Sequence, residues 1–205
     1  VKLNMISLKK TTEMIIKHKF IDGEFIERPN RFLTKVKVGS KIIDSHLPDP
    51  GRLKELLIPG ARLLLTSENA KNRKTKFSTQ AVYSNNILIS LNTQLPNKFV
   101  KYLLQNKYLE FLNKWDFDRS EVTYGNSRFD FLLKRNNQKM IVEVKSATLV
   151  ENKIAKFPDA ITDRGVRHVR HLEKMCKNGM KTMILFVVQR SDAKCFEPQW
   201  ERDPK

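Results

Sequence analysis

Residues 127–146 read SRFDFLLKRNNQKMIVEVKS, and this stretch decides the fold of the second half of the chain. Two runs with apolar residues at alternate positions flank the polar segment 135–138, a pattern typical of an antiparallel β-hairpin. A four-residue loop at 135–138 and a two-residue loop at its centre give the same pairing. In that pairing Asp130 lies opposite Glu143, and Arg128 lies opposite Lys145.

The hairpin predicts a site with two carboxylates and one lysine. Opposed side chains of an antiparallel pair have Cβ atoms about 4.5–5.5 Å apart, and Lys145 shares the face of Glu143 because strand side chains repeat every two residues. Facing Asp130 and Glu143 among Phe and Val side chains require a compensating cation. Oxygen ligands alone favour Mg²⁺ or Mn²⁺ over zinc. The alternative is a solvated strand face or a structural ion pair, since Glu-x-Lys is a common spacing.

Such a site suits phosphodiester hydrolysis. A metal held by Asp130 and Glu143 would neutralise phosphate oxygens and activate water, and Lys145 would orient that water or stabilise the developing charge. We therefore take these three residues as the candidate catalytic groups.

A helix over about 162–178 follows the hairpin, with Gly179 as its C-terminal cap. We expect Val169, Leu172 and Cys176 to face inward and a basic stripe to face outward toward phosphates. An ordinary solvated face is the alternative for this stripe, whose members are Arg164, Arg167, His168, His171 and Lys174.

The first half of the chain has the pattern of a small closed β-barrel resembling an OB-fold. A short helix is expected at 52–57, and a basic loop at 69–76 separates two of the strands. This loop and Arg52, the first residue of that helix, supply candidate nucleic-acid contacts, with an ordinary surface loop as the alternative. The candidate residues are Arg52, Lys71, Arg73, Lys74 and Lys76, together with Arg128 of the hairpin. The expected strands span 25–28, 31–38, 41–45, 61–66, 77–83 and 87–91.

A change from alternating to helical spacing near residue 95 divides the chain. We expect a nucleic-acid-binding domain over 1–95 and an α/β domain over 96–205. The second domain should contain a helix, three antiparallel strands, a second helix and a final strand at 182–189.

Charge points to a polyanionic partner. The 205 residues include 39 Lys and Arg against 22 Asp and Glu, a formal charge of +17 spread along the whole chain. DNA is the expected partner, with RNA also open, because neutralised phosphates release counterions. An ordinary basic protein is the alternative.

Location and assembly follow from the remaining composition. Cys176 and Cys195 are the only cysteines, which favours a reducing compartment. No apolar run is long enough to span a bilayer, and the N-terminus lacks a secretion signal, so we expect a cytoplasmic protein without a membrane partner. The oligomeric state stays open, a homodimer included.

Five segments resemble the sugar fermentation stimulation protein A family: PGRLKELLIPG at 50–60, YGNSRFDFLL at 124–133, VEVKS at 142–146, FPDA at 157–160 and LFVVQR at 185–190. The resemblance implies an OB-like N-terminal barrel joined to a PD-(D/E)XK restriction-endonuclease-like domain that binds DNA. The nuclease motif maps onto Asp130, Glu143 and Lys145, with Phe129 where such nucleases often have proline. A further acid, Glu110 or Glu121, could complete the metal shell.

Two functions are consistent with these features. The first is a DNA-binding, magnesium-dependent nuclease. The second is a DNA-binding regulator of sugar fermentation that keeps a nuclease-like fold without cutting.

Overall fold

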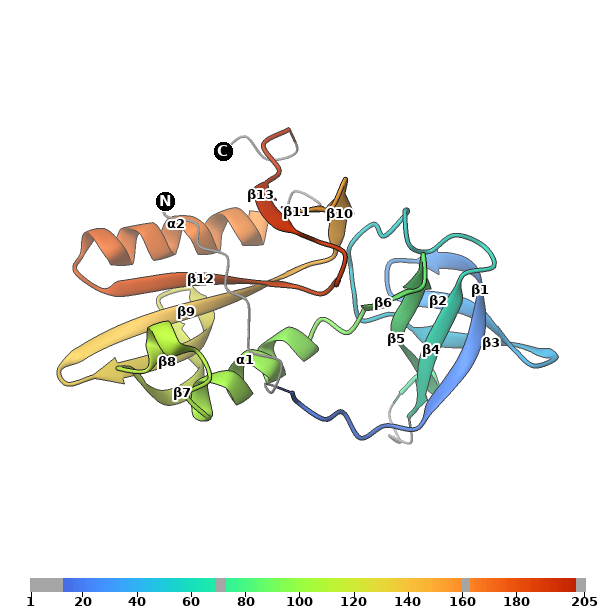
Figure 1. Ribbon diagram of the computed structural model, residues 1–205, viewed down its shortest axis with the longest axis horizontal. Helices are drawn as coiled ribbons and strands as arrows, with labels where there is room; N and C mark the ends of the chain where they lie inside the picture. The colour runs from blue at the N-terminus through green and yellow to red at the C-terminus, as the bar shows by residue number, and fades with distance from the viewer. Residues whose placement is uncertain (1–12, 69–72, 160–162, 202–205) are drawn as a thin grey trace.

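The computed structural model describes residues 13–68, 73–159 and 163–201, which form a barrel and a second, mixed α/β part (Figure 1). Six strands build the barrel sheet in the order β3-β2-β1-β4-β5-β6, and a parallel pairing of β3 with β5 closes five of them into the expected OB-type barrel. The strands are β1 (Phe20–Asn30), β2 (Leu33–Val38), β3 (Lys41–His46), β4 (Arg62–Ser67), β5 (Phe77–Ser84) and β6 (Ile87–Ser90).

The barrel encloses one apolar core. Val36, Leu63, Leu65, Val82 and Ile89 are fully buried in it, and they come from alternate positions of different strands. Alternation of this kind is what a sheet with one solvated face requires. The core fixes the strand register and so holds the loops of the barrel in place.

The expected helix at 52–57 is wrong, because this segment folds as a set of turns. The backbone N–H groups of Leu56 and Leu57 both donate to the Leu53 carbonyl, and Leu53 has a left-handed φ of 51°. Flanking prolines leave too few residues to offset helix nucleation. The three leucines are instead buried in the barrel core.

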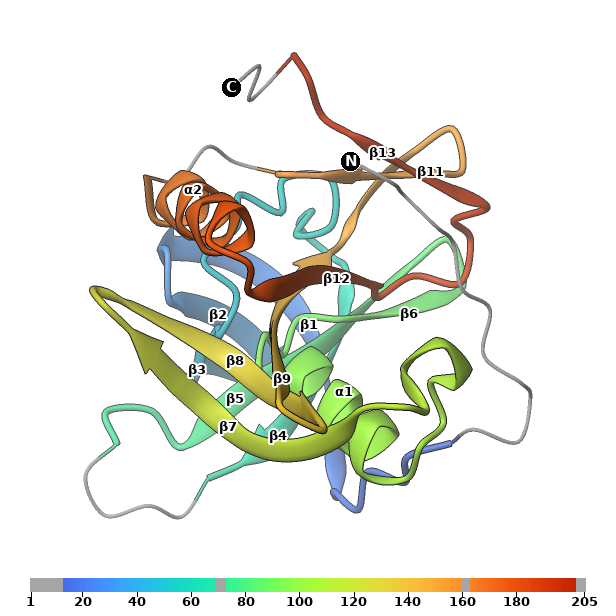
Figure 2. The ribbon, with the colours of Figure 1, turned by 90° about the vertical axis from the view of Figure 1, so that its left-hand side faces the viewer.

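The second part is built on a four-stranded sheet in the order β12-β9-β8-β7. Helix α1 packs on one face and α2 on the other (Figure 2). Strand β12 runs parallel to β9 after the α2 crossover. The elements are α1 (Leu95–Gln105), η1 (Glu110–Leu112), β7 (Asp116–Tyr124), β8 (Ser127–Arg135), β9 (Gln138–Ala147), α2 (Asp163–Lys177) and β12 (Lys181–Val188).

The pairing of β8 with β9 has the expected register over Phe131–Arg135, whereas the expected pairs Asp130–Glu143 and Arg128–Lys145 lie beyond the end of this ladder. Phe131 lies opposite Val142, and Arg135 lies opposite Gln138. The ladder ends at the Phe131 pair, because the next donor on β9, the Val144 N–H, bonds the Asp130 side chain. The two strands therefore diverge at the residue that the sequence marks as functional.

A small three-stranded sheet was not expected. It consists of β10 (Leu149–Glu151), β11 (Ile154–Phe157) and β13 (Cys195–Pro198), in the order β10-β11-β13. Strands of three or four residues are too short to show a period in the sequence.

Helix α2 forms where expected, and Gly179 follows it with a φ of 85°. Its expected inward face is partly wrong. Leu172 is buried, but Val169 is 47% exposed and Cys176 is exposed. His168 and Met175 join Leu172 on the buried face, because His168 reaches a carboxylate on β9 and Met175 fills more apolar volume than Cys176 can. In the described parts of the chain, no helix is long and apolar enough to cross a membrane.

Candidate active site

Glu143 lies in the middle of β9 and is only 4% exposed. Its Oε1 accepts hydrogen bonds from Lys145 Nζ and, at 2.7 Å, from His168 Nδ1. Its Oε2 is buried and has no hydrogen-bond partner among the residues that the structure describes. A buried carboxylate oxygen without a partner is costly unless something positive binds it. This oxygen is the feature of the site that most needs a cation.

Asp130 lies on β8 beside Glu143, and both of its carboxylate oxygens are hydrogen-bonded. Asn97 Nδ2 donates to Oδ1 at 2.6 Å, and the Val144 N–H donates to Oδ2 at 2.7 Å. Burial raises the pKa of Asp130, and the neighbouring Glu143 charge raises it further, while both hydrogen bonds and Lys145 lower it. The structure thus brings Asp130, Glu143 and Lys145 together.

Lys145 is held by Glu143, with a side chain that is 17% exposed. It stands on the α2 side of β9, two residues after Glu143, as strand alternation requires. The ammonium therefore lies at the mouth of the site, between the buried Glu143 and solvent.

An aromatic and histidine cluster supports Glu143 from α2. The Phe129 ring is fully packed, with its centroid 5.5 Å from the ring centroids of both His168 and His171. His168 is buried and bonds Glu143, so its expected place on an exposed phosphate-binding stripe is wrong. His168 turns inward because its Nδ1 forms a hydrogen bond with the buried carboxylate of Glu143.

The other residues of the expected stripe also lie on α2. Arg164, Arg167 and Lys174 are exposed, and His171 is half-buried. Arg128 is exposed and lies 3.7 Å from Glu121 across the β7–β8 pair. Within the described parts of the chain, none of these cations forms an ion pair with Asp130 or Glu143.

Neither candidate third acid completes a metal cluster. Glu121 is exposed, with a left-handed φ of 57°, and Glu110 lies in η1. Among the residues that the structure describes, no group of three His, Cys, Asp or Glu side chains is placed to bind a metal ion. Asp130 and Glu143 would have to be joined by backbone carbonyl or water oxygens, which Mg²⁺ readily accepts.

A groove of about 920 Å³ lies on the barrel face, where the β1–β2 turn and the β4–β5 loop meet β3. Arg73 and Lys74 line it, and Arg73 pairs with Glu68 at 2.9 Å. Phe32, which is 50% exposed, also lines it. OB-folds bind oligonucleotides on this face and these loops.

The remaining expected contacts lie apart from this groove or outside the described structure. Lys76 is exposed in the same loop, while Lys71 lies outside the described residues. Arg52 lines a different cleft, between the barrel and the second part.

Asn97 is the site residue that the sequence did not reveal. It is near the start of α1, beyond Pro96, and no motif distinguishes it from a surface asparagine. Only the packing of α1 on the β8–β9 sheet brings its amide to Asp130. A pairing rule within one hairpin cannot detect such a long-range contact.

Comparison with known proteins agrees with this architecture. The family model described as "Sugar fermentation stimulation protein RE domain" matches residues 94–205, and the one described as "SfsA N-terminal OB domain" matches residues 26–91. A sugar fermentation stimulation protein homolog of Clostridium kluyveri is 42% identical over 193 residues, covering 94% of this chain and 84% of the relative. A homolog from Clostridium botulinum strain Alaska E43 is 43% identical over 193 residues, with the same coverage.

A solved structure shares the whole arrangement. The structure of Pyrococcus furiosus SfsA in complex with Ca²⁺ superposes with a TM-score of 0.85 and 27% identity, covering 94% of this chain and 83% of that chain. With two family models that together span most of the sequence, the chain belongs to the sugar fermentation stimulation protein family.

Proposed function

We propose that this protein is a metal-dependent nuclease that binds DNA and hydrolyses its phosphodiester bonds. In this proposal residues 1–95 form the nucleic-acid-binding domain and residues 96–205 a PD-(D/E)XK nuclease domain. The observation that carries it is the partnerless, buried Oε2 of Glu143 beside Asp130 and Lys145. The raised pKa of Asp130, caused by its burial and by the neighbouring Glu143 charge, is also typical of catalytic carboxylates.

The residues present fit a divalent cation. Asp130 and Glu143 offer hard oxygen ligands, and Glu143 Oε2 has no competing hydrogen bond. A related protein is described in complex with Ca²⁺, an ion with the same preference for oxygen. Mg²⁺ or Mn²⁺, when bound, would supply charge neutralisation for the phosphate and activation of water.

The chain's own groups divide the remaining work. His168 and Lys145 fix the orientation of Glu143 through its Oε1, and Asn97 and the Val144 N–H fix Asp130. Lys145 places its ammonium beside Glu143, so it orients the attacking water or donates to the phosphate oxygen as negative charge develops. Both carboxylates therefore enter the reaction already positioned.

The barrel supports the nucleic-acid part of the proposal. Its groove combines the cations Arg73 and Lys74 with the exposed ring of Phe32. Single strands are bound by such pairs of basic and aromatic side chains. The outer cations of α2, Arg164, Arg167 and Lys174, would guide the backbone toward Lys145. RNA fits the same chemistry as DNA.

A cleavage assay with Lys145→Ala tests this function. Circular single-stranded DNA, plasmid and RNA are incubated with the purified protein in Mg²⁺, in Mn²⁺ and in chelator. We expect metal-dependent cleavage by the parent and a rate lower by at least about 100-fold in the variant, because no ammonium then orients the water or donates to the phosphate oxygen. Oligonucleotide affinity should stay within about two-fold, because the Lys145 ammonium is already paired with Glu143.

Equal loss of affinity and cleavage in Lys145→Ala would contradict the catalytic role of this lysine. Absence of cleavage in every condition, with tight and sequence-selective DNA binding by the parent, would contradict the nuclease and support the non-catalytic regulator. A regulator discriminates between DNA sequences at a given salt concentration, whereas a nuclease that contacts the backbone does not.

A further inference from the structure

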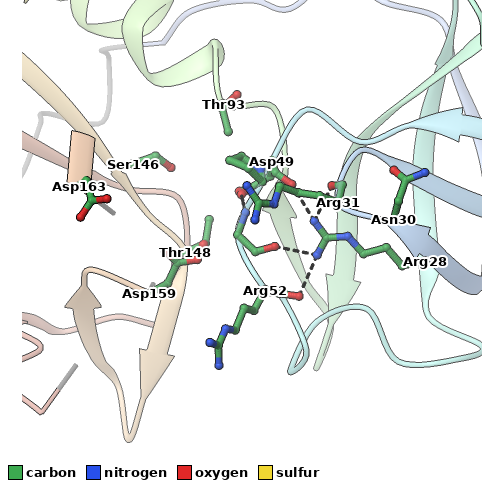
Figure 3. A pocket seen from close by; sticks show the side chains of 12 residues that line it. Arg28, Asn30, Arg31, Asp49, Arg52, Thr93, Ser146, Thr148, Asp159 and Asp163 are labelled. Atoms are coloured by element: carbon green, nitrogen blue, oxygen red, sulfur yellow. Dashed lines mark hydrogen bonds between the residues drawn. The ribbon is translucent and has the colours of Figure 1, made fainter. Parts of the chain in front are cut away.

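A second cleft, of about 870 Å³, lies between the barrel and the C-terminal part (Figure 3). One wall is formed by barrel segments 28–31 and 49–52. The other is formed by Ser146 and Thr148, which follow Lys145 along the chain, and by Asp163 at the start of α2. The volume lies in the range of ordinary ligand-binding pockets. The cleft is distinct from the groove on the barrel face.

The barrel wall is held in place by Arg28. Its Nη1 donates to the carbonyls of Gly51 and Arg52 at 2.7 and 2.8 Å, and its Nη2 donates to those of Arg31 and Asp49 at 2.7 and 3.1 Å. These four bonds fasten the 49–52 loop to the end of β1. Because the Arg28 guanidinium is hydrogen-bonded to backbone carbonyls, Arg28 has a structural role in the cleft and is not a candidate ligand-binding residue.

Two other arginines of this wall have unused charge. Arg31 and Arg52 are exposed, and their carbonyls, not their guanidinium groups, take part in the Arg28 cluster. Neither forms an ion pair with any residue that the structure describes. Figure 3 shows the Arg52 head group turned away from the Arg28 hydrogen bonds. Unpaired guanidinium groups on a rigid wall are suited to bind phosphate oxygens.

The opposite wall leads directly to the catalytic lysine. Ser146 is the next residue after Lys145, and Thr148 is about 10 Å from Lys145 along an extended chain. Gln189 Nε2 donates to Ser146 Oγ at 2.8 Å, which leaves the serine hydroxyl hydrogen available for an acceptor such as a phosphate oxygen. The cleft therefore begins one residue after Lys145, on the opposite side of β9 from the Lys145 side chain.

Two of the acidic residues of the cleft belong to the contact between its walls. A Cβ at Gly51 would lie 2.4 Å from Asp159 Oδ2 and 2.9 Å from Asp49 Oδ1, so glycine lets the loop approach Asp159 closely. The Gly51 N–H also donates to Asp49 Oδ1 at 2.7 Å. These carboxylates face the glycine, and the arginines are left to face an anion.

We propose that this cleft holds a phosphodiester group of the substrate strand other than the one being cleaved, through Arg31, Arg52 and Ser146. The inference rests on the proposed nuclease function and assigns a further subsite to it. The ligand is a single-stranded polynucleotide backbone, and free inorganic phosphate is the alternative source of the same chemistry.

Fluorescence anisotropy with a labelled oligothymidylate tests the subsite, with chelator present so that no cleavage occurs. Arg31→Gln and Arg52→Gln should each weaken affinity by about ten-fold at low salt and lower the slope of log affinity against log salt by about 0.7. Both side chains are exposed and lack structural bonds, so unchanged melting temperatures should confirm that the variants fold. Arg135→Gln removes an equally exposed arginine at the far tip of the β8–β9 hairpin and should change affinity by less than about two-fold.

The outcomes separate the subsite from the nuclease. Cleft variants that bind as tightly as Arg135→Gln, or more tightly than the parent, would overturn the subsite even if the parent cleaves DNA. Stabilisation of the parent by inorganic phosphate, lost in Arg52→Gln while oligonucleotide affinity is unchanged, would assign the cleft to free phosphate and overturn the strand proposal. Weakened binding by both cleft variants supports the subsite, even if the parent does not cleave.

Discussion

At the scale of single residues, the central feature is a pair of carboxylates, one buried and one half-buried, whose four oxygens differ in their hydrogen bonding. Three of them accept hydrogen bonds, and Glu143 Oε2 accepts none from the residues that the structure describes. The hairpin pattern predicts Asp130, Glu143 and Lys145, because the register of the hairpin places them near one another. It does not predict Asn97 or the inward position of His168, since those contacts come from helices that pack on the sheet.

Asn97→Ala tests how Asp130 is positioned. A hydrogen bond to a charged group contributes about 1.5–3 kcal/mol, so its loss should raise the half-saturating Mn²⁺ concentration for cleavage by about 10–100-fold. The same loss raises the pKa of Asp130, so the acidic limb of the pH profile should move to higher pH. Calorimetric Mn²⁺ titration gives a readout independent of activity. Unchanged metal affinity and pH profile would show that Asn97 is only structural.

Asp49→Asn tests how a buried carboxylate in the cleft between the barrel and the second part affects stability. Burial raises the pKa of Asp49, and Asp159 raises it further against the lowering effect of the Gly51 N–H. A raised pKa in the folded state means that the charged form costs stability. This penalty is absent below the unfolded pKa of about 3.9 and grows as pH rises through the folded pKa. The asparagine keeps an acceptor for Gly51, so the melting temperature should rise at neutral pH, by about 2–4 °C per kcal/mol recovered.

The pH dependence of that gain is the control for Asp49→Asn. The difference in melting temperature between variant and parent should shrink as pH falls toward about 4, where the parent carboxyl is protonated as well. A constant difference at all pH values, or a loss of stability at neutral pH, would contradict the assigned cause.

At the scale of elements, α2 shows what a helical pattern can and cannot predict. Composition and the terminal Gly179 locate the helix correctly, but rotation about its axis depends on what it packs against. The apolar Val169 and Cys176 suggest one face, while the Glu143–His168 bond and Met175 bring the neighbouring face inward. The predicted helix at 52–57 is wrong for a related reason: burial of its leucines in the barrel core outweighs their helix propensity.

A pair of variants in α2 tests this rotation. Leu172→Ala should lower the free energy of unfolding by about 2–5 kcal/mol, because Leu172 is buried in the core under α2. Val169→Ala should change it by less than about 0.5 kcal/mol, because Val169 is largely exposed. Urea denaturation measures both. A larger loss of stability in Val169→Ala than in Leu172→Ala would contradict the observed rotation and support the inward face predicted from the apolar pattern.

At the scale of the whole molecule, exposed cations lie both in the barrel groove and along α2. The formal charge of +17 predicts a polyanionic partner but does not say where it binds. The OB barrel could be predicted from its strand spacing, whereas both clefts depend on loops and on contacts between distant segments. The short strands β10, β11 and β13 could not be predicted, because segments of three or four residues show no clear periodicity.

Cleavage by Glu143→Gln, compared with the parent in Mn²⁺ and in chelator, is the most direct test of a catalytic metal site at Glu143. The substitution keeps the shape of the side chain and removes the charge that a cation requires at the buried Oε2. We predict metal-dependent cleavage by the parent, a loss of at least about 100-fold in the variant, and unchanged oligonucleotide affinity in chelator. Cleavage by the variant at the parental rate, or cleavage by the parent that persists in chelator, would contradict a metal site at Glu143.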